Sequence, residues 1–193
     1  MNKVEVFKTE INYIKDDLYR NDLMYLIDGL PDYFFEIPAS STGKYHPEYT
    51  TSESGLVRHT KVVARIAKEL IDNPCIGGKY TKREQDLMII ACVLHDGLKS
   101  GNPKERYTRF DHPLLAAQYV RDNKENLSMN DEDIEFIASV IETHMGPWIT
   151  DYNGVDVLEP PKTKYQNFVH MCDYIASRKF LNVSFDEEEN IIG

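Results

Sequence analysis

Apolar residues recur every three or four positions along most of this sequence, which is the spacing of one face of a helix. Residues 3–29 follow this period and predict one or two amphipathic helices, ended by Gly29 and Pro31. Residues 32–54 lack the period and contain two prolines and a glycine. They predict a long loop, and long loops in compact domains are often functional.

The same period predicts five more helices, and local signals mark several of their ends. Thr81 and Thr163 each begin a capping box, and acidic residues 131–133 favour the positive N-terminal end of a helix. The predicted helices cover 55–72, 81–95, 113–123, 131–144 and about 163–181, and the predicted loops cover 97–110 and 145–162.

Strand signals are weak throughout, and the chain shows no internal repeat. The fold class is therefore predicted to be all-α, a bundle of about six or seven helices. The expected organisation is one domain over 1–193, with a core at about 55–180 that carries the chemistry. An N-terminal helical extension covers 1–31, and an acidic tail, expected to be solvated, covers 182–193.

The composition is that of a globular protein, with 193 residues, 41% hydrophobic and 28% charged. The formal net charge is −10. General binding to a nucleic-acid backbone needs a surface rich in Lys and Arg, so that function is excluded. Small anionic substrates remain possible, because bound metal ions reverse the local field.

The chain's beginning has no apolar segment or cleavage site typical of a signal peptide, and no apolar run approaches the ~20 residues of a membrane span. Cys75, Cys92 and Cys172 are an odd number without the spacing of metal ligands. Cys92 and Cys172 lie in apolar helical segments and are expected to be buried, inert thiols. A reducing cytoplasm is the simplest setting, so a cytoplasmic protein without membrane association is expected.

Several chemically versatile side chains lie on helix faces that should be buried. His59 is three residues after Leu56, and His144 continues an apolar stripe at helical spacing. Asp173 lies on the apolar side of the last helix, and His95 and Asp96 end the apolar run MIIACVLHD.

Taken alone, a histidine on an apolar face is usually a hydrogen-bonded core residue. A carboxylate on such a face is costly to bury unless it is paired or bound to a metal. A metal site explains the inward imidazoles and carboxylates together. Neutral imidazoles and carboxylates suit Zn, Mn or Fe.

His59, the His95-Asp96 pair and Asp173 resemble the H…HD…D pattern of the HD superfamily of metal-dependent phosphohydrolases. The resemblance covers roughly residues 55–180. It implies an all-helical domain in which the side chains of these four residues bind a metal ion.

His112, which opens a helix with Pro113, and His144 resemble the further histidines of HD proteins that hold a second metal. The resemblance implies one or two divalent transition metal ions (Fe, Mn, Zn, Co or Ni). The residues it implies for the first ion are His59, His95, Asp96 and Asp173, and for the second Asp96, His112 and His144. The alternatives are an exposed helix residue for His112 and a helix C-cap for His144.

Lys99, three residues after Asp96, matches the HD-x-x-K form of many phosphodiesterase members, and Asp96 and Lys99 are the expected catalytic residues. The alternative for Lys99 is an ordinary surface lysine. The loop 38–47 carries hydroxyl, ammonium and imidazole groups suited to phosphate, without the spacing of a P-loop. Its expected substrate-binding residues are Ser40, Ser41, Thr42, Lys44 and His46, and the alternative is a polar surface loop.

The expected activity is hydrolysis of a phosphoester in a small phosphorylated substrate, with a nucleotide as the favoured substrate, by a hydroxide formed at the metal. The segment after His144 reads Met-Gly-Pro-Trp and lacks the further motifs of the HD-GYP proteins, so cyclic di-GMP hydrolysis is not supported. Two alternatives stay open. One is an HD-type di-iron oxygenase, and the other is a nucleotide-binding module without catalysis.

Overall fold

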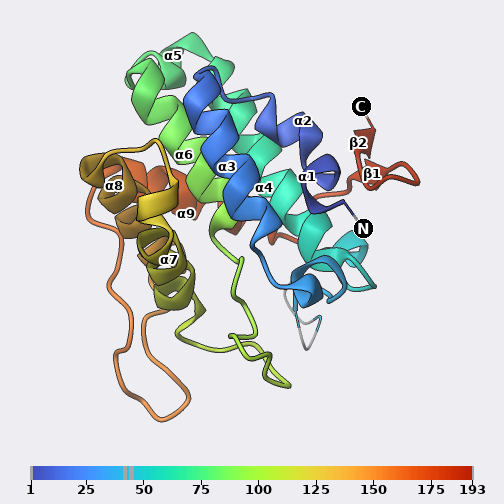
Figure 1. Ribbon diagram of the computed structural model, residues 1–193. Coiled ribbons are helices and arrows are strands. Elements are labelled where there is room, and N and C mark those ends of the chain that lie inside the picture. Colours follow the sequence, from blue (N-terminus) through green and yellow to red (C-terminus); the bar gives the residue numbers. More distant parts are fainter. Residues whose placement is uncertain (1, 41–42, 44–45, 193) are drawn as a thin grey trace.

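The computed structural model describes residues 2–40, 43 and 46–192, and the regular secondary structure of these residues is almost entirely helical (Figure 1). The all-α prediction is confirmed. Six helices contain eleven residues or more within the described residues, in agreement with the predicted bundle. They are α3 (Asp17–Asp28), α4 (Gly55–Asp72), α6 (Lys82–Leu94), α7 (His112–Asp122), α8 (Asp131–Glu142) and α9 (Lys164–Ala176).

Shorter elements connect and extend these helices. The single-turn α-helices are α1 (Lys3–Val6), α2 (Lys8–Ile11) and α5 (Pro74–Gly77), and the 3₁₀ turns are η1 (Asp32–Phe35), η2 (Glu48–Thr50) and η3 (Lys124–Asn126). A small antiparallel pair joins β1 (Ser184–Phe185) to β2 (Ile191–Ile192).

The helix ends show where local signals were sufficient. Both predicted capping boxes form, with Thr81 and Thr163 at the N-caps of α6 and α9. Two bounds were wrong. Residues 3–29 form three helices rather than one or two, because Asp16 caps α3 and separates it from α2. The last long helix ends at Ala176 rather than near Leu181.

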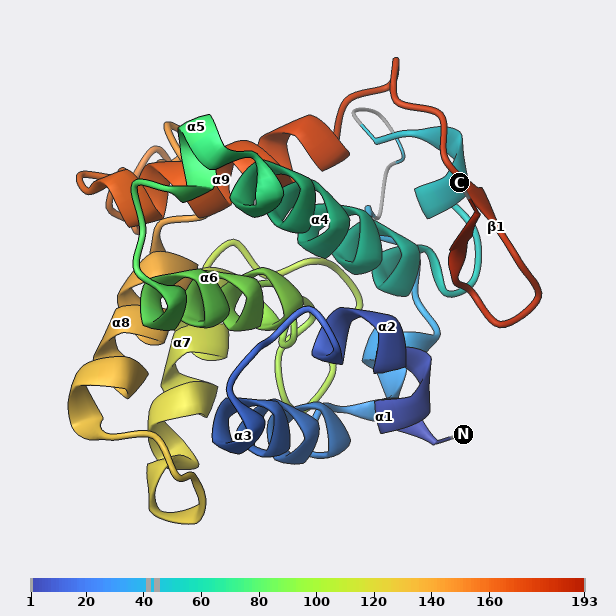
Figure 2. The same ribbon diagram turned by 90° about the horizontal axis from the view of Figure 1, so that it is seen from above.

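The long helices pack around one hydrophobic core (Figure 2). Helix α4 packs against α6 and α9, α6 packs against α8, and α7 pairs with α8. The N-terminal helices belong to the same core, since Phe7 and Leu26 are fully buried within it. Buried Asp86 of α6 also accepts hydrogen bonds from the backbone N–H groups of Lys15 and Asp16.

The acidic C-terminal segment is docked on the protein through Glu189 and Asn190, which corrects the expectation of a solvated tail at these two residues. Glu189 accepts two hydrogen bonds from the Arg58 guanidinium, at 2.5 and 2.8 Å. The buried Lys61 ammonium donates to Asn190 Oδ1 at 3.1 Å, and Phe185 packs on Tyr49. Residues 186–188 remain exposed.

Three long connections lie at one end of the bundle, at the bottom of Figure 1. They precede α4, join α6 to α7 and join α8 to α9. The C-terminal end of α6 and the N-terminal end of α7 open onto these loops, so this end positions the residues of the predicted site. None of the described helices is both long enough and apolar enough to cross a membrane.

Candidate metal centre

The six residues expected to bind metal come together at the loop end of the bundle. His59 lies on α4, His95 and Asp96 end α6, His112 begins α7, His144 follows α8, and Asp173 lies on α9. The four histidines and Asp96 are at most 2% exposed. The predicted inward orientation is confirmed, and the alternative of an exposed His112 is wrong.

Asp96 lies between two pairs of histidines. Its Oδ2 atom is 3.8 Å from His59 Nε2 and 3.4 Å from His95 Nε2. Its Oδ1 atom is 3.0 Å from His112 Nε2 and 3.6 Å from His144 Nε2. One carboxylate oxygen therefore faces each pair, which is the arrangement of a carboxylate that bridges two cations.

Asp173 approaches the first histidine pair from α9. Its Oδ1 atom is 2.9 Å from His59 Nε2 and 3.8 Å from His95 Nε2. Its side chain is 18% exposed, whereas that of Asp96 is 2% exposed. The site therefore reaches solvent beside Asp173.

Backbone carbonyl groups fix the orientation of three of the imidazoles. The Nδ1 atoms of His95, His112 and His144 lie 2.7, 2.7 and 2.8 Å from carbonyl oxygens three residues earlier. A carbonyl oxygen only accepts, so each Nδ1 carries the hydrogen and donates it. In a neutral imidazole the Nε2 atom then presents a lone pair, which is the tautomer that binds metal.

The pKa values of His59, His144 and the two carboxylates agree with ligands that are ready to bind a cation, whereas the pKa of His95 is shifted the other way. Burial lowers the pKa of His59 and lowers that of His144 to about 4, which keeps both imidazoles neutral. Burial raises the pKa of Asp96 and Asp173, but neighbouring Lys and His groups outweigh it and hold both below their ordinary range. Burial lowers the pKa of His95, and the two carboxylates raise it above its ordinary value.

These groups are mostly acceptors that face one another. His112 Nε2 and His144 Nε2 are 3.3 Å apart, and neither Asp96 Oδ1 nor His95 Nε2 makes a hydrogen bond of good geometry. Buried lone pairs at such distances repel unless a cation lies between them. Within the part of the chain that the structure describes, two sets satisfy the spacing for a metal ion, one with His59, His95 and Asp96 and one with Asp96, His112 and His144. The donor set therefore fits metal ions.

Lys99 lies inside the site rather than on the surface. It is 8% exposed, and its ammonium donates a hydrogen bond to Asp96 Oδ2. Tyr33 of η1 holds this turn, because its hydroxyl donates to Gly101 O at 2.8 Å and accepts from the Ser100 N–H at 3.3 Å. The surface alternative for Lys99 is wrong.

Part of the loop 38–47 reaches the site. The His46 ring packs edge-on against the His59 ring at 5.5 Å, and burial lowers the pKa of His46 to about 3. The Ser40 hydroxyl accepts a hydrogen bond from the Gly43 N–H at 3.2 Å. The other expected substrate-binding residues, Ser41, Thr42 and Lys44, lie outside the described residues.

Sequence reasoning missed His170, which supports the backbone at His144. Its Nδ1 atom is 2.8 Å from His144 O, to which it donates. The chain turns at Gly146, where φ is +68°, and a Cβ there would lie 2.1 Å from the His170 ring. His170 is three residues before Asp173 on α9, and that spacing was the only signal in the sequence.

We expect Gly146→Ala to destabilise the protein more than Gly154→Ala. Both glycines have positive φ, which costs a non-glycine residue about 1–2 kcal/mol. Only Gly146 has a neighbour, since nothing lies within 4 Å of a Cβ at Gly154. Displacing the His170 ring should add about 1–3 kcal/mol, measured as the difference in unfolding free energy between the two variants. Equal destabilisation by the two substitutions would show that the His170 ring moves aside without a cost in stability.

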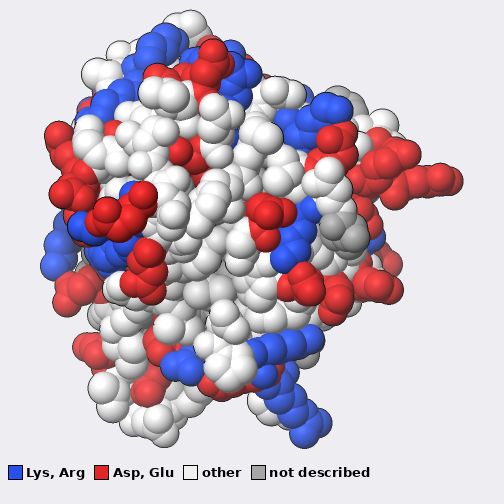
Figure 3. Space-filling model, viewed as in Figure 1, with Lys and Arg blue, Asp and Glu red and all other residues white. Residues whose placement is uncertain are grey.

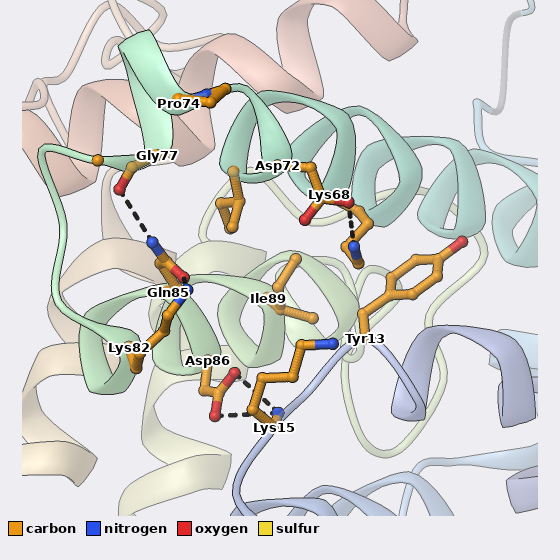
Figure 4. Close-up of a pocket in the computed structure, with 12 residues that line it drawn as sticks. Tyr13, Lys15, Lys68, Asp72, Pro74, Gly77, Lys82, Gln85, Asp86 and Ile89 are labelled. Carbon is orange, nitrogen blue, oxygen red and sulfur yellow. Dashed lines mark hydrogen bonds and ion pairs between the residues drawn. The ribbon is translucent and has the colours of Figure 1, made fainter.

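A cavity of about 300 Å³ lies at the opposite end of α4 and α6 (Figure 4). Several of the polar groups around it are already paired. Lys68 forms an ion pair with Asp72, and Gln85 donates to Gly77 O at 2.9 Å. The span from His59 to Asp72 along α4 corresponds to roughly 20 Å, so this cavity is separate from the metal centre.

Positive side chains lie near the mouth of the site, although the protein is acidic as a whole. Figure 3 shows Lys and Arg side chains at the lower end of the molecule, over the loop between α6 and α7. In this loop Lys104 and Arg106 are exposed and form no ion pair with the described residues. They give an approaching anion a local attraction that the net charge does not provide.

Comparison with known proteins identifies the family. The HD domain family matches residues 56–178, which is more than half of the chain. The chain therefore belongs to the HD domain family, whose members are generally metal-dependent hydrolases, and to the superfamily of metal-dependent phosphohydrolases. No significant match was found among curated proteins or among solved structures.

Proposed function

We propose that this protein is a two-metal phosphohydrolase that cleaves a phosphoester of a small substrate, most favourably a nucleotide. The observation that carries the proposal is the position of Asp96, whose two oxygens face two separate histidine pairs. Two ions held by one carboxylate lie close enough to bind the same phosphoryl group.

Each ion has its own set of side chains in this proposal. The first would be held by His59, His95, Asp96 and Asp173, and the second by Asp96, His112 and His144. When bound, divalent ions lower the pKa of coordinated water and offset negative charge on phosphoryl oxygens. Neutral imidazole and carboxylate donors suit Fe, Mn, Zn, Co or Ni.

The remaining polar groups of the site bind and orient the substrate. The Lys99 ammonium, beside Asp96, donates to a phosphoryl oxygen. His46 closes the site over His59, and its buried Nδ1 atom has no hydrogen-bond partner among the described residues. That atom is free for a polar group of the substrate. The open side at Asp173 admits the organic part.

The experiment that tests this function is a turnover screen of phosphate esters with added Mn, Fe, Co, Ni or Zn. We expect release of phosphate or a nucleotide product that depends on metal and ceases with a chelator. Two other outcomes contradict the proposal. Oxygen consumption with iron and no phosphate release indicates the di-iron oxygenase, and nucleotide binding without product indicates a binding module.

We expect His144→Ala to lower the metal content by about one ion per chain. His144 Nε2 faces Asp96 Oδ1 and His112 Nε2, and its ring packs edge-on against His95, so its loss removes a ligand of the second set and keeps every ligand of the first. Metal is measured by elemental analysis after reconstitution with excess metal and desalting. His46→Ala is the control, because it removes a nearby imidazole that belongs to neither set. Wild-type protein that never exceeds one ion would contradict the two-metal site.

We also propose that residues 1–193 form a single domain. The match to the HD family covers residues 56–178, but Phe7 and Leu26 are buried in the same core as the matched residues. The docked tail adds the contacts of Arg58 and Lys61. We expect one cooperative unfolding transition, with coincident midpoints by circular dichroism and by tryptophan fluorescence. Two separate transitions would show that a flanking segment folds independently.

A further inference from the structure

An aromatic surface adjoins the metal centre on its open side. The rings of Trp148 and Tyr174 are stacked, with an interplanar angle of 14° and centroids 5.9 Å apart. The His170 ring lies 6.1 Å from Trp148 and 6.0 Å from Tyr174. The Arg178 guanidinium lies 4.1 Å from the Tyr174 centroid. We call Trp148, His170, Tyr174 and Arg178 the aromatic wall.

The aromatic wall is directly linked to residues proposed to bind metal. Tyr174 follows Asp173, whose side chain is 18% exposed, the largest exposed fraction among the six residues proposed to bind metal. His170 donates to the His144 carbonyl, and Trp148 is four residues after His144. On α9, positions 170 and 174 lie on the solvent side of Asp173, since Val169, Cys172 and Ala176 form the buried side. The exposed part of Asp173 and the rings of His170 and Tyr174 therefore share the solvent-facing side of α9.

The wall is rigid but not buried. Trp148 is 50% exposed and Tyr174 is 40% exposed. Single exposed apolar residues are common, but here two large rings are fixed by stacking, by Arg178 and by His170. A preorganised aromatic face loses little conformational entropy when a flat group stacks on it. Such a face is typical of sites that bind bases.

We propose that the exposed face of Trp148 stacks on the base of a nucleotide whose phosphate lies at the metal centre. One face of Tyr174 packs on Trp148, and the Arg178 guanidinium lies over the Tyr174 ring. The face of Trp148 that points away from Tyr174 therefore remains for a ligand. This inference rests on the proposed function and deepens it, because it assigns the part of the substrate that does not react.

The test compares two ligands that differ only in the base, adenosine 5′-phosphate and ribose 5-phosphate. Trp148 is the one tryptophan of the chain, so its fluorescence reports on this position alone. With metal-loaded protein in a stopped-flow instrument, before turnover, we expect adenosine 5′-phosphate to quench the emission. We expect it to bind roughly five- to hundredfold more tightly than ribose 5-phosphate, the range of base–aromatic stacking.

Two variants separate the wall from other exposed aromatic residues. Calorimetric titration of Trp148→Leu should give nearly equal affinities for the two ligands. Tyr152→Leu should keep the wild-type ratio, because Tyr152 lies in the same loop and is 92% exposed but is outside the wall. Trp148 and Tyr152 are both exposed, so neither change removes core packing.

The outcomes distinguish this inference from the proposed function. Preferential, quenching binding of adenosine 5′-phosphate without hydrolysis of any phosphate ester supports the wall and contradicts the hydrolase. Metal-dependent hydrolysis with equal affinity for the two ligands supports the hydrolase and overturns the wall. Failure of both ligands to bind overturns the wall as well.

Discussion

Asp96→Asn should remove bound metal and abolish metal-dependent turnover while the helical fold is retained. The amide has nearly the volume of the carboxylate but lacks its charge, and both oxygens of Asp96 face histidine Nε2 atoms. Loss of an outer-shell partner alone typically costs 10–100-fold in metal affinity or activity. Loss of a residue shared by two ions should cost more, so we expect metal affinity and turnover each to fall by about a hundredfold or more.

Elemental analysis and circular dichroism of the purified variant test this expectation. Asp133→Asn is the matched control, because Asp133 is also 2% exposed and interacts with Tyr19 and Arg83, away from the metal centre. We expect Asp133→Asn to lower stability and to keep the wild-type metal content. Equal metal content in the Asp96 variant and the wild type would remove Asp96 from the site.

The helices of the core were predictable from the sequence because their signals are local. Thr81 and Thr163 satisfy N–H groups within three residues, and the apolar stripes of α4 and α8 determine which side is buried. The same stripes placed His59 and His144 on inward faces. The two histidines come into one site because α4 and α8 both pack against α6.

The parts that were missed depend on contacts between distant residues. The tail docks because Glu189 meets Arg58, and nothing near residue 189 in the sequence indicates an arginine 131 positions away. His170 supports His144 only because α9 lies beside the end of α8. The break between α2 and α3 has a local cause in the Asp16 N-cap, and Asp86 of α6 adds a long-range one by accepting hydrogen bonds from the backbone of Lys15 and Asp16.

The sequence could not predict which way the Asp96 carboxylate is oriented or which group the Lys99 ammonium contacts. The resemblance implied that Asp96 is shared between two ions, and the structure adds that each of its oxygens faces one histidine pair. The resemblance made Lys99 an expected catalytic residue, and the structure adds that its ammonium lies against Asp96, although a lysine in a loop with two glycines is usually exposed.

Lys99→Ala should keep the metal content and lower turnover by roughly ten- to hundredfold. The Lys99 ammonium has three donors and no acceptor, so it cannot bind metal and is suited to phosphate. A lost charge-assisted hydrogen bond is worth about 1.5–3 kcal/mol, which corresponds to this range of rates. Lys99 lies beside Asp96, where the phosphoryl group would be held, and would offset the charge that develops on the phosphoryl oxygens, so kcat and kcat/KM should fall together.

Lys104→Ala is the matched control for this prediction. Lys104 belongs to the same loop but is exposed and forms no ion pair with the described residues, so its loss should change KM only slightly and leave kcat unaltered. Lys99→Arg should recover part of the activity, because it restores the charge with a different donor geometry. Steady-state kinetics and elemental analysis are measured on the same preparations. If Lys99→Ala loses metal in proportion to its activity, Lys99 stabilises the ligand Asp96 and does not act on the substrate. If its kinetics equal those of Lys104→Ala, Lys99 has no part in the reaction.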